Sequence, residues 1–302
     1  MIRQIKITNY NDEEKTLYLT DPESSGGFAI EKIDGLGPIK ANVITTNIAN
    51  LDGAIFNSAR ANYRNVVFSL YFVGVSDIED IRMSTYRWFP LKQKIKITIK
   101  TDQRECECIG YVESNRPNIF SKNEKTTISV ICPDPYLYSV TETEIKFADT
   151  NNLFEFPFSN ESTSEDLIIF SNYESKRREA LEYTGDFETG ILIKIHILGP
   201  VEGIVLYHIN SGKEMAIDTG KIESLTGSGL NYGDTIYINT KNGEKSVQLL
   251  RNGDYTNILN CLDRNPDWFQ LVKGNNEFAF TATTGEEFIE MSLTYKNAYE
   301  GV

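Results

Sequence analysis

The sequence predicts a mainly β protein in which an α+β first half with one helix is followed by a β-sandwich. Two observations favour this class: short runs rich in β-branched and aromatic residues recur along most of the 302 residues, and a single segment has the periodicity of an amphipathic helix. A third is the pair of Asn-Gly dipeptides at 242–243 and 252–253, because this dipeptide favours tight hairpins between antiparallel strands.

Alternation of apolar and polar residues indicates the strands of the first half. The clearest run is IKITIK at 95–100, which would bury one face and leave the other in water. The expected strands cover residues 5–8, 16–20, 65–73, 94–100, 106–113 and 126–132.

One helix is expected at residues 77–89. Ser76 and Glu79 form a capping box at its start, and Pro90 ends it. The residues expected on its buried face are Ile78, Ile81, Thr85 and Phe89. One helix against a sheet makes this half α+β.

A domain boundary is expected near residue 138, since Pro133, Pro135 and the polar run TETE at 141–144 interrupt the strand pattern. The predicted domains are therefore 1–138 and 139–302. In the second, strands are expected at 190–198, 234–240 and 245–250, and repeated short strands with turn signals favour an antiparallel sandwich of jelly-roll type. The charged segment 171–188 fits a helical turn or a mobile loop equally well.

Composition excludes several function classes. The 43 acidic and 30 basic residues give a net charge of -13, which repels phosphate backbones and argues against direct nucleic-acid binding. No apolar run approaches 18 residues and no signal peptide is evident, so we expect synthesis in the cytoplasm without membrane insertion. The cysteines, which match neither a disulfide framework nor a zinc site, are Cys106, Cys108, Cys132 and Cys261. We expect free thiols.

No constellation for catalysis, metal or cofactor binding is evident. The only histidines, His196 and His208, stand in separate strand-like segments without ligand-spaced partners, and no nucleophile elbow or P-loop occurs. We therefore predict no enzyme, no metal and no cofactor.

Sugar binding by the second half is an open alternative. Alternation in 266–272 places Phe269 and Leu271 inside and Trp268 at least partly outside, so the indole could stack on a pyranose. Asp263, Arg264 and Asn265 precede Trp268 and could supply polar groups.

Several short segments, taken in order along the chain, carry a resemblance to a known family. In the first half they are Gly35-Leu36-Gly37-Pro38, Asp52-Gly53-Ala54, Arg64-Asn65-Val66-Val67-Phe68, Gly110-Tyr111-Val112-Glu113 and Cys132-Pro133-Asp134-Pro135-Tyr136. In the second half they are Arg251-Asn252-Gly253, Trp268-Phe269-Gln270-Leu271, Gly274-Asn275-Asn276 and Tyr299-Glu300-Gly301-Val302. Together they resemble the distal tail proteins of siphophages that infect Gram-positive hosts. The segment 140–190 departs most from this pattern.

The resemblance implies a split-barrel-like N-terminal domain that closes a hexameric ring, followed by a galectin-like or carbohydrate-module-like sandwich. It implies a structural hub of the tail tip or baseplate, present in the virion and assembled in the host cytoplasm. The implied partners are further copies of the chain, the tail tube protein, the tail-associated lysin or fibre protein and, in some phages, receptor-binding proteins.

A closed ring needs an interface whose rotation closes, which an extended β-arm or an exposed strand edge can supply. We assign this role to the Gly- and Pro-rich segment 21–40, as an arm or lumen-facing loop rather than a core strand, with Gly35, Leu36, Gly37 and Pro38 at the interface. Two rival functions are an adhesin that binds host polysaccharide through the second domain, and a cell-wall hydrolase, for which no catalytic site is evident.

Overall fold

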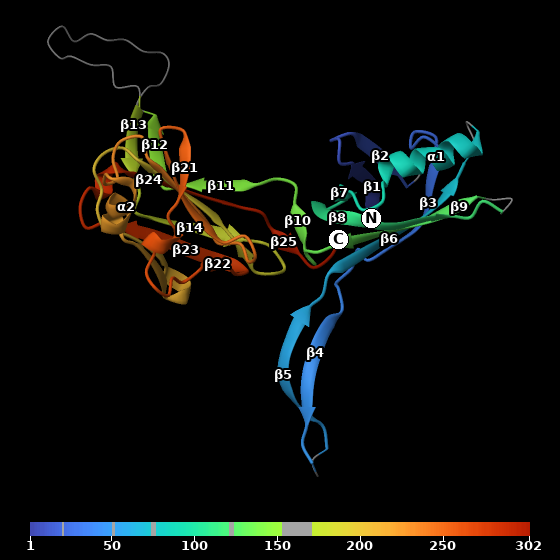
Figure 1. Cartoon of the computed structure of the whole chain (residues 1–302), viewed down its shortest axis with the longest axis horizontal. Coiled ribbons are helices and arrows are strands. Elements are labelled where there is room, and N and C mark those ends of the chain that lie inside the picture. Colours follow the sequence, from blue (N-terminus) through green and yellow to red (C-terminus); the bar gives the residue numbers. More distant parts are fainter. Residues whose placement is uncertain (20, 50–51, 74–76, 121–123, 153–170) are drawn as a thin grey trace, which may run out of the picture. The chain divides into compact units, whose positions relative to one another are not determined.

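The computed structural model of the chain describes residues 1–19, 21–49, 52–73, 77–120, 124–152 and 171–302 (Figure 1). The chain divides into unit 1, Met1–Thr141 together with Ala298–Val302, and unit 2, Glu142–Asn297. This division differs from the expected domains at its end: the last five residues lie in unit 1, because Ala298 and Tyr299 pair with Tyr138 and Leu137.

Unit 1 is built on one large antiparallel sheet with the order β2-β1-β7-β8-β9-β6-β3, to which β10 and β25 add at one side. Its strands are β1 (Ile2–Thr8), β2 (Glu14–Tyr18), β3 (Phe28–Asp34), β6 (Arg64–Phe72), β7 (Lys94–Thr101), β8 (Glu105–Pro117), β9 (Lys125–Cys132), β10 (Leu137–Ser139) and β25 (Ala298–Tyr299). The edge strands β2 and β3 contact each other without a hydrogen-bonded ladder, so the sheet curls toward an incompletely closed barrel.

The alternation in β7 produces the expected two faces. Ile95, Ile97 and Ile99 are at most 1% exposed and lie in the core of unit 1. They pair across β8 with Gly110, Cys108 and Cys106 respectively, so the same core holds the buried thiols.

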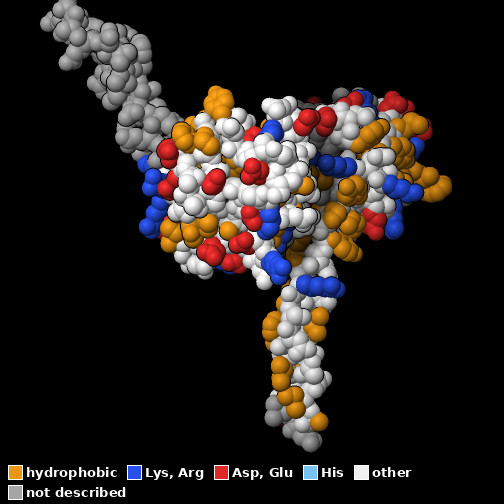
Figure 2. Space-filling view, turned by 60° about the vertical axis from the view of Figure 1, so that its left-hand side comes forward, with side chains coloured by type: hydrophobic (Ala, Val, Ile, Leu, Met, Phe, Trp, Pro, Cys, Tyr) orange, Lys and Arg blue, Asp and Glu red, His pale blue; other side chains and the backbone are white. Residues whose placement is uncertain are grey.

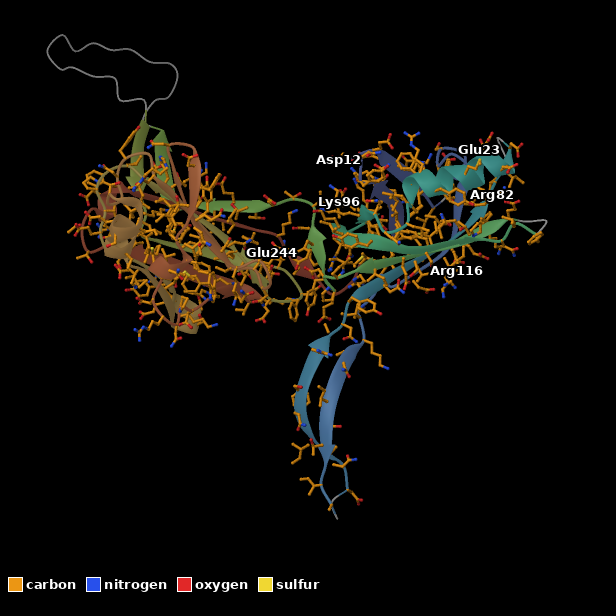
Figure 3. The ribbon with its side chains drawn as sticks, in the orientation of Figure 1. Asp12, Glu23, Arg82, Lys96, Arg116 and Glu244 are labelled. Atoms are coloured by element: carbon orange, nitrogen blue, oxygen red, sulfur yellow. The ribbon has the colours of Figure 1, made fainter. Side chains whose placement is uncertain are left out.

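Helix α1 (Ile78–Trp88) covers the core of unit 1. Its N-cap is Asp77, whose carboxylate accepts a hydrogen bond from the Glu79 N–H, so the expected capping box is wrong by one residue; Ser76 lies outside the described residues. Ile81, Thr85 and Phe89 are buried as expected, but Ile78 is exposed. Arg82, labelled in Figure 3, binds both carboxylate oxygens of Glu124 at 3.1 and 3.0 Å and so ties the helix to the end of the loop before β9.

The expectation that 21–40 is an arm rather than a core strand is wrong. Residues 28–34 of that segment form β3, which pairs with β6, and Phe28 and Ala29 are buried. Gly26 and Gly27 adopt positive φ in the turn just before β3. These glycines therefore form a turn that leads into a core strand, and they do not indicate an arm.

Unit 2 consists of two main antiparallel sheets that enclose one apolar core. The larger has the order β11-β24-β16-β19-β20-β21, formed by β11 (Thr143–Lys146), β16 (Leu192–Ile197), β19 (Thr235–Asn239), β20 (Ser246–Arg251), β21 (Asp254–Asn257) and β24 (Ile289–Tyr295). The smaller has the order β14-β23-β17-β18, formed by β14 (Arg178–Tyr183), β17 (Ile204–His208), β18 (Lys213–Ile217) and β23 (Gly274–Thr281). This is the expected sandwich.

Smaller elements complete the description. Three two-stranded sheets are formed by β4 (Ala41–Asn47) with β5 (Ala54–Ala61), β12 (Ala148–Asn152) with β13 (Ser171–Ser175), and β15 (Thr189–Gly190) with β22 (Gln270–Leu271). Short 3-10 turns cover Ile209–Ser211, Leu259–Cys261 and Glu286–Phe288.

Two expectations for the second half need correction. Segment 171–188 is neither a helical turn nor a loop, because it contains the whole of β13 and β14. Helix α2 (Thr219–Thr226) was missed, although Asp218 caps its start by accepting from the Lys221 N–H and Gly227 ends it with a φ of 82°.

The turn at Asn252-Gly253 is confirmed: Arg251 pairs with Asp254, and both turn residues have positive φ.

All four cysteines are buried free thiols, as expected. Phe269 and Leu271 are fully buried and Trp268 is half-buried, also as the alternation indicated. Within the described ranges, no helix has both the length and the apolar character that a membrane span requires.

Candidate assembly site

The rest of unit 1 does not cover the hairpin β4–β5. All fifteen residues of its two strands are exposed, on both faces. Figure 1 shows the hairpin standing clear of the sheet of unit 1, and the sticks of Figure 3 show its side chains pointing away from the ribbon on either side. No other described strand of unit 1 is exposed along its whole length.

The exposed surface of this hairpin is apolar and nearly uncharged. Val43, Ile44, Ile55 and Phe56 are 46 to 62% exposed. In a chain of net charge -13, residues 41–61 contain one acidic and one basic side chain, Asp52 and Arg60. Figure 2 shows hydrophobic and uncharged side chains along most of the hairpin.

An isolated two-stranded hairpin is at best marginally stable in water, and its edges offer unpaired backbone groups to any neighbouring strand. Native proteins usually blunt such edges with lysine or proline, and β4 and β5 contain neither. An apolar, nearly uncharged hairpin with two open edges is therefore a candidate surface for contact with another strand.

The root of the hairpin is formed by the residues on either side of it. A cavity of 440 Å³ is lined there by Gly35, Gly37, Pro38, Ile39, Lys40, Asn62, Tyr63 and Asn65. Of the four residues predicted at the interface, Gly35, Gly37 and Pro38 thus lie at the root of the hairpin, whereas Leu36 is 6% exposed and belongs to the core of unit 1.

Arg64, the first residue of β6, holds this root together from inside. Its side chain is fully buried. The guanidinium donates from Nη1 to the carbonyls of Gly35 and Gly37, from Nε to that of Pro135 at 2.8 Å, and from Nη2 to that of Glu300 at 2.7 Å. One side chain therefore joins the segment before β4, the loop before β10 and the C-terminal segment.

Backbone geometry at the root depends on glycine. Gly35 has a φ of 85°, and a Cβ on it would lie 1.9 Å from the carbonyl oxygen of Asn65. Gly301 passes so close to Gly37 that a Cβ would lie 3.1 Å from its Cα. The Gly35 position therefore excludes larger residues, and at Gly301 a larger residue fits only if the neighbouring backbone shifts slightly.

The C-terminal segment is fixed by a second arginine. Arg104 lies 4.4 Å from the ring centroid of Tyr299 and donates to the Gly301 carbonyl at 3.3 Å. The Val302 N–H donates to the Leu36 carbonyl at 3.1 Å. The chain end is thus part of the hairpin root.

Three thiols lie in the core behind Arg64. Burial raises the pKa of the Cys106 thiol to about 11, so this thiol is neutral. The Sγ atoms of Cys108 and Cys132 are 3.8 Å apart. Burial also lowers the pKa of the Arg64 guanidinium, which carbonyl oxygens rather than a bonded carboxylate stabilise here.

The residues considered for sugar binding show a different arrangement. Trp268 packs against the core of unit 2, and the Lys245 ammonium lies over its ring, 5.2 Å from the centroid. Asp263, Arg264 and Asn265 are exposed. The ring face on which a pyranose could stack is therefore shared with a lysine.

The described residues contain no cluster of three or more His, Cys, Asp or Glu side chains that could hold a metal ion. His196 bonds Thr235 through Nδ1 at 2.9 Å, and His208 is buried, stacked on Phe278 at 4.6 Å. Both histidines have structural contacts in unit 2.

Sequence reasoning missed the arm at 41–61 and the role of Arg64. A signal for the arm was present, since this stretch has very few charges for its length. No local signal marks Arg64, because its carbonyl partners are 27 to 236 residues away along the chain.

Comparison with known proteins shows one matching family model and several similar structures. Residues 184–299 match the family model described as "Siphovirus-type tail component, C-terminal domain". No curated protein matches the sequence. Among solved structures, the Dit protein of phage SPP1, described as a paradigm of the hub adsorption apparatus in phages infecting Gram-positive hosts, is 13% identical with a TM-score of 0.65, covering 97% of this chain and 98% of that one. A chain of the phage P2 baseplate in its activated conformation with Ca is also 13% identical, with a TM-score of 0.48 and the same coverage.

The family match covers most of unit 2, and the likeness to the SPP1 protein extends over both units. The segments that carried the sequence resemblance meet in space: Gly35 and Gly37, Arg64, Pro135 and Glu300 all belong to the hairpin root. Residues 184–299 thus resemble the C-terminal domain of siphovirus-type tail components, and the chain as a whole has the fold of the SPP1 Dit protein.

Proposed function

We propose that this tail component is the hub of the tail tip and that its copies form a closed, homo-hexameric ring through the hairpin β4–β5. The observation that carries the proposal is the complete exposure of both hairpin strands. A ring needs a heterologous contact, in which an arm of one copy meets a different surface of the next, and a projecting hairpin supplies the arm.

Charge supports another copy of the chain as the partner of the arm. Each copy carries a net charge of -13, so surfaces of two copies repel each other on average. The arm, with its single Asp52 and Arg60, is a stretch that can approach a second copy without that cost. Its Val43, Ile55 and Phe56 would then supply the apolar contact.

The root gives the arm a defined direction. Arg64 fixes the segments on which β4 begins, and Gly35 accepts only a narrow backbone geometry. A ring closes only if each copy makes its contact at the same angle, so a rigid root favours closure over an open helical chain.

The further partners that we propose are the tail tube protein on one side of the ring and the tail-associated lysin or fibre protein on the other, with receptor-binding proteins in some phages. The support is the fold shared with the SPP1 protein and the sequence resemblance to distal tail proteins. The sequence-derived interface residues Gly35, Gly37 and Pro38 become, in this proposal, the root of the arm rather than its contact surface.

Charged substitutions on the arm test the proposal directly. Ile55→Asp and Phe56→Asp place a carboxylate on an exposed strand, where folding tolerates it and an apolar interface does not. Leu225→Asp is the matched control, since Leu225 is 56% exposed on α2 of unit 2.

Negative-stain imaging and mass photometry of the full chain, alone and with purified tail tubes, give the readout. Six-fold rings are expected for wild type and Leu225→Asp, and single subunits for the arm variants. Rings that form equally well with the arm variants would overturn the role of the hairpin, and a wild-type chain that stays monomeric even on tail tubes would overturn the hub.

A further inference from the structure

A polar cleft of 670 Å³ opens at one end of unit 2, where β19 begins and β20 ends. Its walls come from residues 200–202, from the first turns of α2, from the loop 228–234 and from the turn after β20. Trp268 lies toward the opposite end of this strand pair: its ring contacts Lys245, close to Glu244, which Figure 3 labels. The cleft is therefore distinct from the sequence-derived sugar site.

The loop 228–234 is held rigidly by one buried ion pair. Asp234 is 4% exposed, and Arg251 binds its two carboxylate oxygens at 2.8 and 2.6 Å. The same guanidinium donates to the Ser228 hydroxyl at 2.7 Å and to the Gly229 carbonyl at 2.8 Å. A site whose wall is fixed in advance loses little entropy when a ligand binds.

The fixed loop presents an aromatic ring to solvent. Tyr232 is 76% exposed, while its backbone N–H is held by the Asn231 side chain at 2.8 Å. Leu230, two residues earlier, is 3% exposed and bridges to Val201. The loop therefore has a buried anchor, and it leaves a large aromatic side chain in water beside the cleft.

The free charges of the cleft are negative. Glu202 and Glu223 line it, and among the described residues neither has an ion-pair partner. The positive charge of Arg251 is neutralised by Asp234. Anionic ligands such as phosphates are therefore disfavoured, whereas groups that donate hydrogen bonds to carboxylates are favoured.

One ligand class combines the required features. A pyranose offers a C–H face that packs on an aromatic ring and a row of hydroxyls that donate to carboxylates and exchange hydrogen bonds with amides. Tyr232 supplies the ring, Glu202 and Glu223 the acceptors, and Asn231 and Asn252 the amides. The volume is that of an ordinary ligand site.

We propose that this cleft binds a neutral or amino-substituted saccharide unit of a cell-surface glycan, with Tyr232 as the stacking residue. The inference concerns unit 2 alone and holds whether or not the chain forms a ring. It assigns to the tail component a binding activity besides its structural one.

A glycan array of neutral, amino-substituted and anionic oligosaccharides, probed with the full chain and followed by calorimetric titration of the best soluble hit, tests the proposal. The variant Tyr232→Ala should lower the affinity by about tenfold or more, the size expected for loss of a central aromatic contact. Glu202→Gln and Glu223→Gln should lower it severalfold, because an amide is a weaker acceptor than a carboxylate.

Two controls separate this cleft from other aromatic surfaces. Tyr255→Ala removes a 61% exposed tyrosine that lies outside the cleft lining, and Trp268→Ala removes the other candidate ring. Both should bind like wild type. The proposal fails if the array shows no neutral or amino-substituted hit, if Tyr232→Ala binds as tightly as wild type, or if Trp268→Ala instead loses binding.

Discussion

Each unit of the chain contains an arginine that fixes backbone segments, but the two arginines differ in burial and in the surface that they support. In unit 1, Arg64 is fully buried and binds carbonyl oxygens of three separate segments, so that the root of an exposed arm is fixed. In unit 2, Arg251 is 20% exposed and binds the carboxylate of Asp234, so that a loop beside a cleft is fixed. The first arrangement fixes the base of an exposed hairpin, and the second fixes one wall of a cleft within the unit.

A second comparison, between two hairpins, shows that a hairpin's contribution to its unit depends on how many of its side chains the unit buries. The hairpin β4–β5 has no buried residue, whereas β20 of the hairpin β20–β21 buries Val247 and Leu249 completely. We therefore expect that unit 1 folds without the hairpin β4–β5, whereas unit 2 does not fold without β20–β21. The sequence also provides a separate probe for each unit, since its two tryptophans are Trp88 in α1 and Trp268 in unit 2.

Excision of each hairpin should give the largest effect. Replacing 41–61 by two glycines joins ends that are already paired, Ala41 with Ala61, and should change the stability of unit 1 by no more than about 1 kcal/mol while abolishing ring formation. Excising 246–257 removes two fully buried side chains and a strand pair, so unit 2 should not fold. Urea unfolding followed through Trp88 and Trp268 separately is the measurement. If unit 1 unfolded after excision of 41–61, the expected difference between the two hairpins would be contradicted.

Removing each arginine should give the next effect. Arg64→Met leaves four carbonyls without their donors in a dry site and should destabilise unit 1 by about 3–5 kcal/mol. Arg251→Met leaves Asp234 beside solvent-accessible loops and should destabilise unit 2 by about 1–3 kcal/mol. Calorimetry of the two transitions checks the order. A smaller loss for Arg64→Met than for Arg251→Met would contradict the assigned role of Arg64.

Two glycines of unit 1, one at the hairpin root and one at the end of the arm, allow the rigidity of these two places to be compared. Gly35→Ala combines positive φ with a clash against the Asn65 carbonyl and should cost about 2–3 kcal/mol. Gly53→Ala, at the end of the arm, has a φ of 97° with open space around the added Cβ, so only the conformational cost of about 1–2 kcal/mol applies. That cost should fall on the arm and leave the unfolding midpoint of unit 1, read through Trp88, unchanged. Equal midpoint shifts would mean that the root is not rigid.

The smallest effect should be a difference in pH response. Burial lowers the pKa of His208 below its usual 6.5, so the unfolded chain binds this proton more readily than the folded one. The contribution of neutral His208 is present above pH 6.5 and is lost as pH falls through that value toward the folded pKa. Unit 1 contains no histidine. Between pH 7 and 5 the unfolding midpoint of unit 2 should fall more than that of unit 1, and His208→Phe should remove the difference.

Carboxylates do not confuse this test. Hydrogen bonds and ion pairs lower the pKa values of Glu13 and Asp102 in unit 1 and of Asp218 and Glu277 in unit 2. The stability that such groups contribute is lost only as pH falls below their usual values of 4.5 and 3.8. A divergence of the units that begins only below pH 4.5 would therefore argue against His208.

Local chemistry predicts most of the fold. Strand β7 follows from alternation, the turn at Asn252-Gly253 from its dipeptide, and α1 from its periodicity and Pro90. The capping residue was misplaced because Ser76 and Asp77 are both good caps in sequence. Helix α2 has only eight residues and a weak apolar face, which leaves little periodicity to detect.

The candidate site was predictable only in part. The glycines at 35 and 37 indicated a special backbone, but not that they form the base of an arm whose strands begin at Ala41. An arm without a buried face has no alternation, so the usual strand signal is missing there. Arg64 and the cleft of unit 2 arise from contacts between distant segments, for which a single sequence carries no local pattern.

The return of the chain end to unit 1 has a consequence for exchange of parts. Strands β10 and β25 lie side by side and antiparallel, so the whole of unit 2 is an insertion whose two ends leave from neighbouring positions, after Thr141 and before Ala298. Any domain whose own termini lie close together could be grafted there by recombination while the last five residues are kept. In this way unit 2 could be exchanged without redesigning the part of unit 1 that carries the arm.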